Sequence, residues 1–483
     1  MALNTKGGAP VIGLDVGAAY IKVVELRPGS KGLTVTGVGI MPTPPGCIEN
    51  DEIIDPGVLA TAVKQLLTES GIKTRSVVAS VAGQSSVVVR VIEVPRMSDK
   101  ELAETMRWEI DRHIPFAPDE VVKDYSVVIR PDEDVTSANM AILLAVAQNA
   151  VVSGQMQIIL DCGLTPHAID VETLASARSI LDISDAYNAE TVALVNIGAS
   201  KTDIGIYESG TLVFPRVIPM GGNALTQAIA AKLGITTEEA ERMKLQFGEV
   251  PADAATAPAA AEDTFSFADF SAPEAPEPAP GGFVNTADGP VFDTAAGFSD
   301  DKTFTPTFGT GGPVFDDAPA APSVDLQPET PAEPFQPEPV VPTFEPEPFS
   351  APEPSSLTPT VLSEGDQQKR DLSDAFLPVL RELAEEIKRS LEYYITRASK
   401  AVQVDRLLVF GGGANLPGLL PYLESQVNVP VYPVGIPPGV VASATGVSEQ
   451  YLNEVAPMLP VVIGLASRDC IAVPGPVAKG RAR

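Results

Sequence analysis

Three residues near the beginning of the chain have the types and spacing of a phosphate-binding turn. Asp15 ends an apolar stretch, Gly17 follows it, and Lys22 lies in the next apolar stretch. Glycine lets the backbone approach a phosphate, and the N–H groups of such a turn form a concavity that suits an anion. Asp15 could hold the waters of a Mg²⁺ ion, and Lys22 could place a positive charge against the phosphates. The alternative is a β-hairpin with a surface lysine, which is a common arrangement.

Two later stretches repeat this arrangement. Asn196 and Gly198 follow a second apolar strand, and a further strand runs to Tyr207. A third apolar strand, 407–410, leads into three consecutive glycines, which are Gly411, Gly412 and Gly413. The order and separation of the turns are more specific than any one of them. They resemble the phosphate and adenosine elements of the superfamily that contains actin, the heat-shock chaperones and the sugar kinases.

The hydrophobic pattern predicts the elements that would position these turns. Residues 9–40 read as alternating strands and turns, 58–70 as an amphipathic helix, and 76–81 as a buried strand. This order is half of an actin-type fold. The block 86–168 interrupts the pattern and reads as a small α/β insertion between two parts of the first domain.

Three further charged residues could face a cleft between the turns. Glu172 opens a helix after the insertion, and the alternative to a cleft position is an exposed glutamate favoured by the helix dipole. Glu241 and Lys244 are spaced i,i+3 on a helix predicted at 237–247. They could face a nucleotide, and the alternative is a surface ion pair. The sequence leaves both questions open.

Composition restricts the class of protein. The chain has 483 residues and a formal net charge of −30, which disfavours binding to nucleic acid through phosphate contacts. It has 3 cysteines far apart and 2 histidines, which disfavours a disulfide framework, a zinc site and Ser/His catalysis. Residues 1–10 lack the apolar core of a signal peptide, and no apolar run reaches the ~18 residues that span a bilayer. We therefore expect a soluble cytoplasmic protein.

One long segment differs in composition from the rest of the chain. Residues 251–370 contain 22 of the 46 prolines, with 21 acidic and 3 basic residues. Such a segment cannot bury enough apolar surface to offset the entropy of ordering, so we expect 250–370 to be a disordered, acidic insertion. The motif Gly289-Pro-Val-Phe292-Asp293 recurs at 312–316. It could be a short docking motif, and the alternative is a low-complexity spacer.

Six groups of residues outside this segment match a known family. They are Gly13-Leu-Asp-Val-Gly17 with Ile21-Lys22-Val-Val-Glu-Leu26, Ile114-Pro-Phe116 with Asp119-Glu-Val-Val-Lys-Asp-Tyr125, Gly221-Gly-Asn-Ala-Leu-Thr226, Ala240-Glu-Arg-Met-Lys244, Glu386-Ile-Lys-Arg-Ser-Leu-Glu-Tyr-Tyr394 and Gly411-Gly-Gly-Ala-Asn-Leu-Pro-Gly-Leu419. Together they resemble the PilM family of type IV pilus assembly proteins, which are actin-like relatives of the division protein FtsA. The resemblance covers about 9–249 and 371–468.

The resemblance implies an α/β, actin-like (duplicated RNase H-like) two-domain ATP-binding fold. It also implies an FtsA-type inserted subdomain in the first domain, beside the long disordered acidic insertion in the second. The implied segments are 9–85 and 169–190 for domain 1 (subdomain 1A), 86–168 for the inserted subdomain 1C, 191–249 and 371–468 for domain 2 (2A and 2B), and 469–483 for a loose tail.

The resemblance also implies which residues bind ATP and Mg²⁺. Asp15 would serve the metal through water, and Glu172 would be the catalytic residue that orients a water. The cofactor-binding residues would be Asp15, Gly17, Ala18 and Lys22 at the first turn, Gly198, Ala199 and Ser200 at the second, Gly222, Glu241 and Lys244 on the ribose and adenine side, and Gly411, Gly412 and Gly413. Asn196 stands where related proteins usually carry an acidic residue. An amide cannot act as a base, so we expect hydrolysis to be slow or absent.

The implied role is that of a cytoplasmic scaffold for a type IV pilus, or for a related type II secretion or competence system. Members of the family bind the cytoplasmic N-terminal peptide of the membrane protein PilN in a groove beside the inserted subdomain. That would tie the chain indirectly to the inner-membrane platform, to the pilus motor and to twitching motility, and a homo-oligomer or ring would be compatible with it. The alternatives are an actively hydrolysing ATPase or sugar kinase, and an FtsA-like division protein. The segment 473–483 has too few apolar residues for the membrane helix of the latter.

Overall fold

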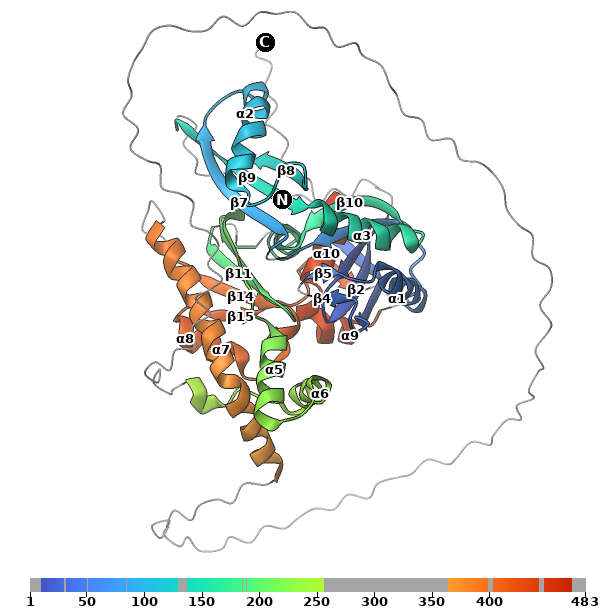
Figure 1. Ribbon diagram of the computed structural model, residues 1–483, viewed down its shortest axis with the longest axis vertical. Helices are drawn as coiled ribbons and strands as arrows, with labels where there is room; N and C mark the ends of the chain where they lie inside the picture. The colour runs from blue at the N-terminus through green and yellow to red at the C-terminus, as the bar shows by residue number, and fades with distance from the viewer. Residues whose placement is uncertain are drawn as a thin grey trace, which may run out of the picture. The chain divides into compact units, whose positions relative to one another are not determined.

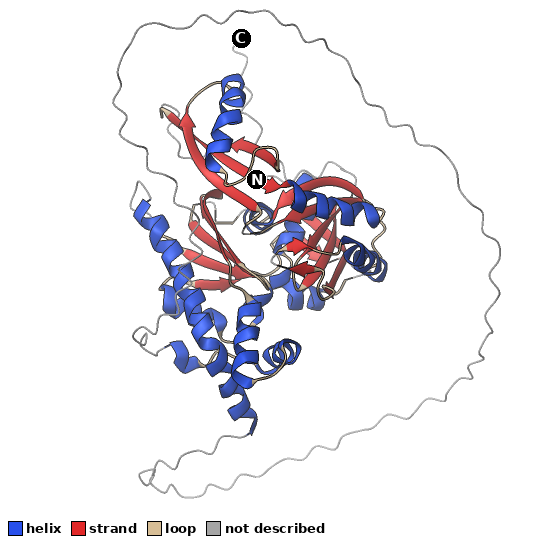
Figure 2. Cartoon of the chain, viewed as in Figure 1, coloured by secondary structure: helices blue, strands red, loops and turns tan. Residues whose placement is uncertain are grey.

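A computed structural model gives the arrangement of most of the chain (Figures 1 and 2). The residues that it describes are 10–29, 32–49, 51–83, 85–128, 137–184, 186–187, 189–255, 364–397, 403–442 and 447–470. The predicted disorder of the acidic insertion therefore falls mostly outside the described residues, as does most of the predicted tail. No helix among the described ranges is long and apolar enough to cross a membrane.

The first sheet contains the first predicted turn. Its strands, in spatial order, are β10 (Thr165–Val171), β6 (Ser76–Val81), β1 (Val11–Val16), β2 (Tyr20–Gly29), β3 (Gly32–Pro42) and β16 (Val440–Ala442). β1, β2 and β3 are antiparallel neighbours, while β6 runs parallel to β1 and β10 runs parallel to β6. A short hairpin of β4 (Ile48–Glu49) and β5 (Glu52–Ile53) follows β3. The apolar side chains of β1 alternate between the two faces of the sheet, so helices can cover both.

Helices cover both faces of this sheet. Ile12 and Leu14 of β1 pack with α1 (Pro56–Glu69) and α3 (Asn149–Asp161). On the other face, Val11 packs with α4 (Glu172–Ala177), with a π-helical turn that continues it to Asp182, and with α10 (Pro460–Ala466). A further short helix, α9 (Glu449–Val455), precedes α10.

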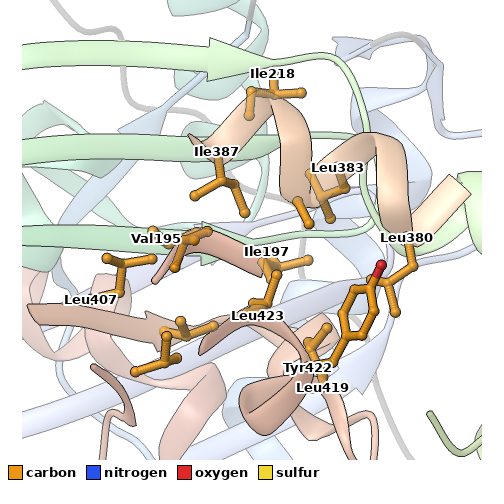
Figure 3. Close-up of a cluster of buried hydrophobic side chains, with 14 of the residues drawn as sticks. Val195, Ile197, Ile218, Leu380, Leu383, Ile387, Leu407, Leu419, Tyr422 and Leu423 are labelled. Atoms are coloured by element: carbon orange, nitrogen blue, oxygen red, sulfur yellow. The ribbon is translucent and has the colours of Figure 1, made fainter. Parts of the chain in front are cut away.

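The second sheet contains the other two turns. Its strands, in spatial order, are β13 (Thr211–Ile218), β12 (Thr202–Glu208), β11 (Thr191–Ile197), β14 (Arg406–Phe410) and β15 (Val431–Pro433). Its helices are α5 (Gly222–Leu233), α6 (Thr237–Phe247), α7 (Glu364–Arg397) and α8 (Leu419–Val427). Figure 3 shows Val195 and Ile197 of β11 packed with Leu383 of α7 and Leu423 of α8.

The two sheets share one layer of helices. Ala175 of α4 and Leu465 of α10 are buried in a cluster that also contains Val78 of the first sheet and Leu194 of the second. The Tyr207 hydroxyl of β12 donates a hydrogen bond of 2.9 Å to the Thr173 carbonyl, which fixes α4 against the second sheet. The first residue of α4, Glu172, is therefore held between the two hairpins.

Residues 87–148 of the block 86–168 form a third sheet, whereas α3 and the start of β10, at the end of the same block, belong to the first sheet. The strands of the third sheet lie in the order β7 (Val87–Pro95), β9 (Asn139–Gln148) and β8 (Val121–Val127), all antiparallel. Helix α2 (Asp99–His113) covers one face and begins with a capping box in which Ser98 and Glu101 bond to each other's backbone. β7 and β8 are the two edge strands of this sheet.

Three boundaries differ from the sequence-based expectation, and the first is the end of the inserted block, which the structure places before α3 and not at 168. β16 pairs with β3 of the first sheet and α10 packs on β1, although the whole of 371–468 was expected in the second domain. The buried, apolar face of the first sheet needs this cover, and sequence position alone could not show it. Helix α7 begins at Glu364, inside the segment expected to be disordered. Lys369 there pairs with Glu249 at 2.8 Å, and Gln367 bonds to Asp371 at 3.0 Å, which supports the earlier start.

Candidate functional site

The first hairpin places Asp15 and Lys22 opposite each other. The register of β1 and β2 pairs these two residues, and Lys22 Nζ lies 2.6 Å from Asp15 Oδ2. The Asp15 side chain is buried. At the turn, the Gly17 N–H donates to the Tyr20 carbonyl at 3.1 Å, and the Thr43 hydroxyl donates to the Gly17 carbonyl at 2.6 Å. These hydrogen bonds hold the turn in one conformation. Ala18, the remaining predicted residue, is half-buried within it.

The second hairpin is anchored to the start of α5. The Gly222 N–H donates to the Gly198 carbonyl at 2.9 Å, and the Asn223 N–H donates to the Ala199 carbonyl at 2.8 Å. A Cβ on Gly221 would lie 2.6 Å from the Gly198 carbonyl oxygen and 2.7 Å from that of Ala199. Only a glycine permits this approach, because any larger residue would push the helix away from the turn.

Lys244 of α6 contacts the start of α5, next to the second turn. Its Nζ lies 2.6 Å from Glu241 Oε2, 2.9 Å from the Gly222 carbonyl oxygen and 2.7 Å from the Thr226 hydroxyl. Thr226 also donates a hydrogen bond to Glu241. The two residues predicted from their i,i+3 spacing thus form an ion pair, and Lys244 also contacts a third predicted residue, Gly222.

The third turn lies against the end of β11. Gly411 has a φ of +90°, which favours glycine, and a Cβ there would lie 2.5 Å from Asn196 Oδ1. A Cβ on Gly413 would meet the Ile197 side chain, whereas one on Gly412 would meet nothing within 4 Å. The second and third turns are therefore in contact, and Asn196 lies at their junction.

Glu172 lies in the space between the hairpins rather than on an exposed helix end. Its Oε2 is 3.3 Å from Lys201 Nζ, and its side chain is 15% exposed. Burial raises the pKa of Glu172 to about 7, against the opposing charge of Lys201, and the negative charge of Asp15 acts in the same direction as burial. A carboxylate with a pKa near neutrality is suited to general-base chemistry.

Three charged residues of this space were not among the predicted site residues. Lys201 Nζ lies 3.8 Å from Asp203 Oδ2, and Ser200 Oγ donates a hydrogen bond of 2.6 Å to Asp51 Oδ1. Burial raises the pKa of Asp203, against the charge of Lys201. Asp203 could have been found, because it faces Asn196 across the hairpin as Lys22 faces Asp15. Asp51 and Lys201 carry no comparable signal in the sequence.

The side chains of this space fit a magnesium ion in their chemistry. Asp15 and Asp203 supply carboxylate oxygens, the ligands that Mg²⁺ prefers in proteins. Asp203 Oδ2 is buried and, among the described residues, has no hydrogen-bond partner. Both carboxylates already face a lysine, at 2.6 Å for Lys22 and 3.8 Å for Lys201. In the part of the chain that is described, no group of three or more Asp, Glu, His or Cys side chains is arranged to hold a metal.

Comparison with known proteins gives two matching families. The model of type IV pilus assembly protein PilM matches residues 13–257, and that of cell division protein FtsA matches residues 193–448. The FtsA of Bacillus subtilis is 26% identical over 266 residues, which are 51% of this chain and 59% of that protein. The FtsA of Pseudomonas aeruginosa is 25% identical over 263 residues, which are 50% of this chain and 62% of that protein. The chain thus spans about three-fifths of the length of these relatives.

A solved structure covers more of the chain. The structure described as a PilM-PilN type IV pilus biogenesis complex aligns with a TM-score of 0.64 and 22% identity, over 96% of this chain and 99% of that one. This likeness concerns the fold. The actin-like ATPase fold predicted from the three turns is confirmed.

Proposed function

Because this chain belongs to the PilM family of type IV pilus assembly proteins, we propose that it is an ATP-binding scaffold of a pilus assembly platform. The proposed nucleotide site is supported by the contacts that bring the turns together. The second turn, the start of α5, Lys244 of α6 and the third turn contact one another, and Glu172 lies between the second hairpin and the charges of the first.

We assign the predicted residues to parts of the nucleotide. The N–H groups of Gly17 and Gly198 donate to the Tyr20 and Lys201 carbonyls, so the N–H groups of the residues that follow them, Ala18 and Ala199, would face the phosphates. Gly222, Lys244 and Glu241 would line the ribose and adenine side, next to the third turn. Asp15 and Asp203 would hold Mg²⁺ through its waters, and the metal would offset the charge of the phosphates.

Nucleotide binding predicts a thermal shift. ATP with Mg²⁺ should raise the melting temperature of the full chain, because a ligand of the folded state stabilises it by mass action. Asp15→Asn keeps the shape of the side chain but removes its charge, so it should reduce the shift. Differential scanning fluorimetry measures both. Asp99→Asn, on the exposed first turn of α2, is the matched control and should behave as the wild type. A full shift in Asp15→Asn would remove Asp15 from the metal site.

We further propose the partner of the scaffold. Family membership supports a PilN-like membrane protein, whose cytoplasmic N-terminal peptide would bind beside the inserted block 86–168. Attachment to the inner membrane would then be indirect, through this partner, and the chain would act from the cytoplasm. Other platform and motor proteins, and a homo-oligomer or ring, would follow from the same role.

The partner proposal has a direct test. A fluorescently labelled peptide, with the N-terminal sequence of the PilN-like protein encoded by the same genome, should gain anisotropy when the full chain is added. We expect a dissociation constant in the micromolar range, as for short peptides held by about 8 kcal/mol. A scrambled peptide is the control. Equal binding of both peptides, with and without ATP, would argue against a specific groove.

A further inference from the structure

Lys201 is a buried cation among carboxylates. It lies in the second turn, and its side chain is 10% exposed. Its Nζ is 3.3 Å from Glu172 Oε2 and 3.8 Å from Asp203 Oδ2. Two carboxylates this close to the ammonium favour its charged form.

The geometry of this cluster is unlike that of a closed salt bridge. Lys22 and Asp15 approach to 2.6 Å with a hydrogen bond. Lys201 Nζ and Asp203 Oδ2, in contrast, are both buried and find no hydrogen-bond partner among the described residues. Buried polar atoms without partners are rare in folded proteins and call for an explanation, such as a ligand that completes them. Here an ammonium donor and a carboxylate acceptor lie 3.8 Å apart, beside Glu172.

We propose that Lys201 is a resident counter-cation of this cleft, and that it sets how strongly the site depends on a divalent metal ion. The proposal rests on the nucleotide site proposed above. Without nucleotide, the ammonium occupies the place between Glu172 and Asp203 that a divalent cation would otherwise take. With a nucleoside triphosphate bound, it supplies the phosphates with a positive charge and with hydrogen-bond donors, beside the metal or in its place.

The charge balance of the cleft supports this role. Four carboxylates interact electrostatically in this cleft, and two lysines oppose them. The carboxylates are Asp15, Asp51, Glu172 and Asp203, and the lysines are Lys22 and Lys201. Removal of the Lys201 charge would leave Glu172 and Asp203 facing each other in a buried setting. Like charges in such a setting repel strongly, and carboxylate oxygens attract Mg²⁺, Mn²⁺ or Ca²⁺. Without nucleotide, the neutral variant should therefore bind a divalent metal ion that the wild type does not bind.

The test uses the metal alone. The melting temperatures of the full chain, Lys201→Met and Lys201→Arg are measured without nucleotide, in EDTA and in millimolar MgCl2, MnCl2 or CaCl2. Lys201→Met should be less stable than the wild type in EDTA and should gain roughly 2 °C or more with metal, the size of a ligand bound well above its dissociation constant. The wild type and Lys201→Arg should not respond. Lys232→Met, on the exposed end of α5, is the matched control and should not respond either.

A second measurement keeps the proposal testable if Lys201→Met does not fold. Binding of a fluorescent ATP analogue to the wild type should weaken less than about ten-fold when EDTA replaces Mg²⁺. A loss of about a hundred-fold or more would overturn the counter-cation role, as would equal metal shifts in the wild type and in a folded Lys201→Met. Absence of nucleotide binding in both buffers would count against the proposed nucleotide site. The metal-only shifts would still decide the role of Lys201.

Discussion

Gly464→Ala is expected to destabilise the folded state strongly. The residues of α10 are all buried, and this helix lies between β1 and α4. A Cβ on Gly464 would overlap the Ala175 carbonyl oxygen and would lie 2.5 Å from the carbonyl carbon. Both are backbone atoms of α4, so neither can move without the helix that carries Glu172. Overpacking a core usually costs about 1–3 kcal/mol, and we expect about 3 kcal/mol or more here, because backbone meets backbone.

The change would also disturb an arginine that links α10 to β10. Arg178 Nη1 donates a hydrogen bond of 2.9 Å to the Gly464 carbonyl, and Nη2 lies 3.0 Å from Asp170 Oδ2. Urea unfolding of the full chain measures the loss, and Gly435→Ala is the matched control, because a Cβ there would meet nothing within 4 Å. A Gly464→Ala protein as stable as Gly435→Ala would show that α10 does not pack against α4 in solution.

Asn196→Asp is expected to raise ATP turnover. The wild type should release phosphate at well below about 1 s⁻¹, the lower end of ordinary enzyme rates. Asn196 lies at the junction of the second and third turns and faces Asp203 across the hairpin. An amide cannot accept a proton, whereas a carboxylate could act as a base, and general-base help is typically worth ~10²–10⁴-fold. We therefore expect a gain of about 10²-fold in phosphate release by the variant.

Two controls separate chemistry from binding. Asn196→Ser should stay as slow as the wild type, and the double variant with Glu172→Gln should lose part of the gain if Glu172 helps to orient the water. Nucleotide affinity should change little in either, which the fluorescent analogue reports. A wild type that already turns over at about 1 s⁻¹ or faster would refute the scaffold proposal and favour the actively hydrolysing ATPase.

Local patterns in the sequence were enough to predict the hairpins and their turns. Asp15, Gly17 and Lys22 are neighbours along the chain, so the alternation of apolar residues and one glycine turn place them together. The pair of Glu241 and Lys244 follows from the helical spacing i,i+3 for the same reason. The order of these turns also predicted the actin-like fold, which is confirmed. Their roles in nucleotide binding stay predictions.

The position of Glu172 could not be predicted from local sequence patterns. The sequence allowed either an exposed helix end or a cleft, since both suit a glutamate at the start of a helix. In the structure Glu172 lies in the space between the hairpins, where its Oε2 is 3.3 Å from Lys201 Nζ. This contact depends on how α4 packs between two sheets, and no local spacing encodes that packing.

The sequence by itself therefore determined the repeated strand–glycine–strand units, the fold class and most of the residues at the turns. Only the tertiary structure decided that Lys201 and Asp203 share a buried space with Glu172, and that β16 and α10 return to the first sheet. The physical reason is the range of the interactions. Strand alternation, turns and helical faces depend on residues a few positions apart, whereas ion pairs across the cleft and the contact of Gly464 with Ala175 depend on segments that meet only when the sheets and helices pack.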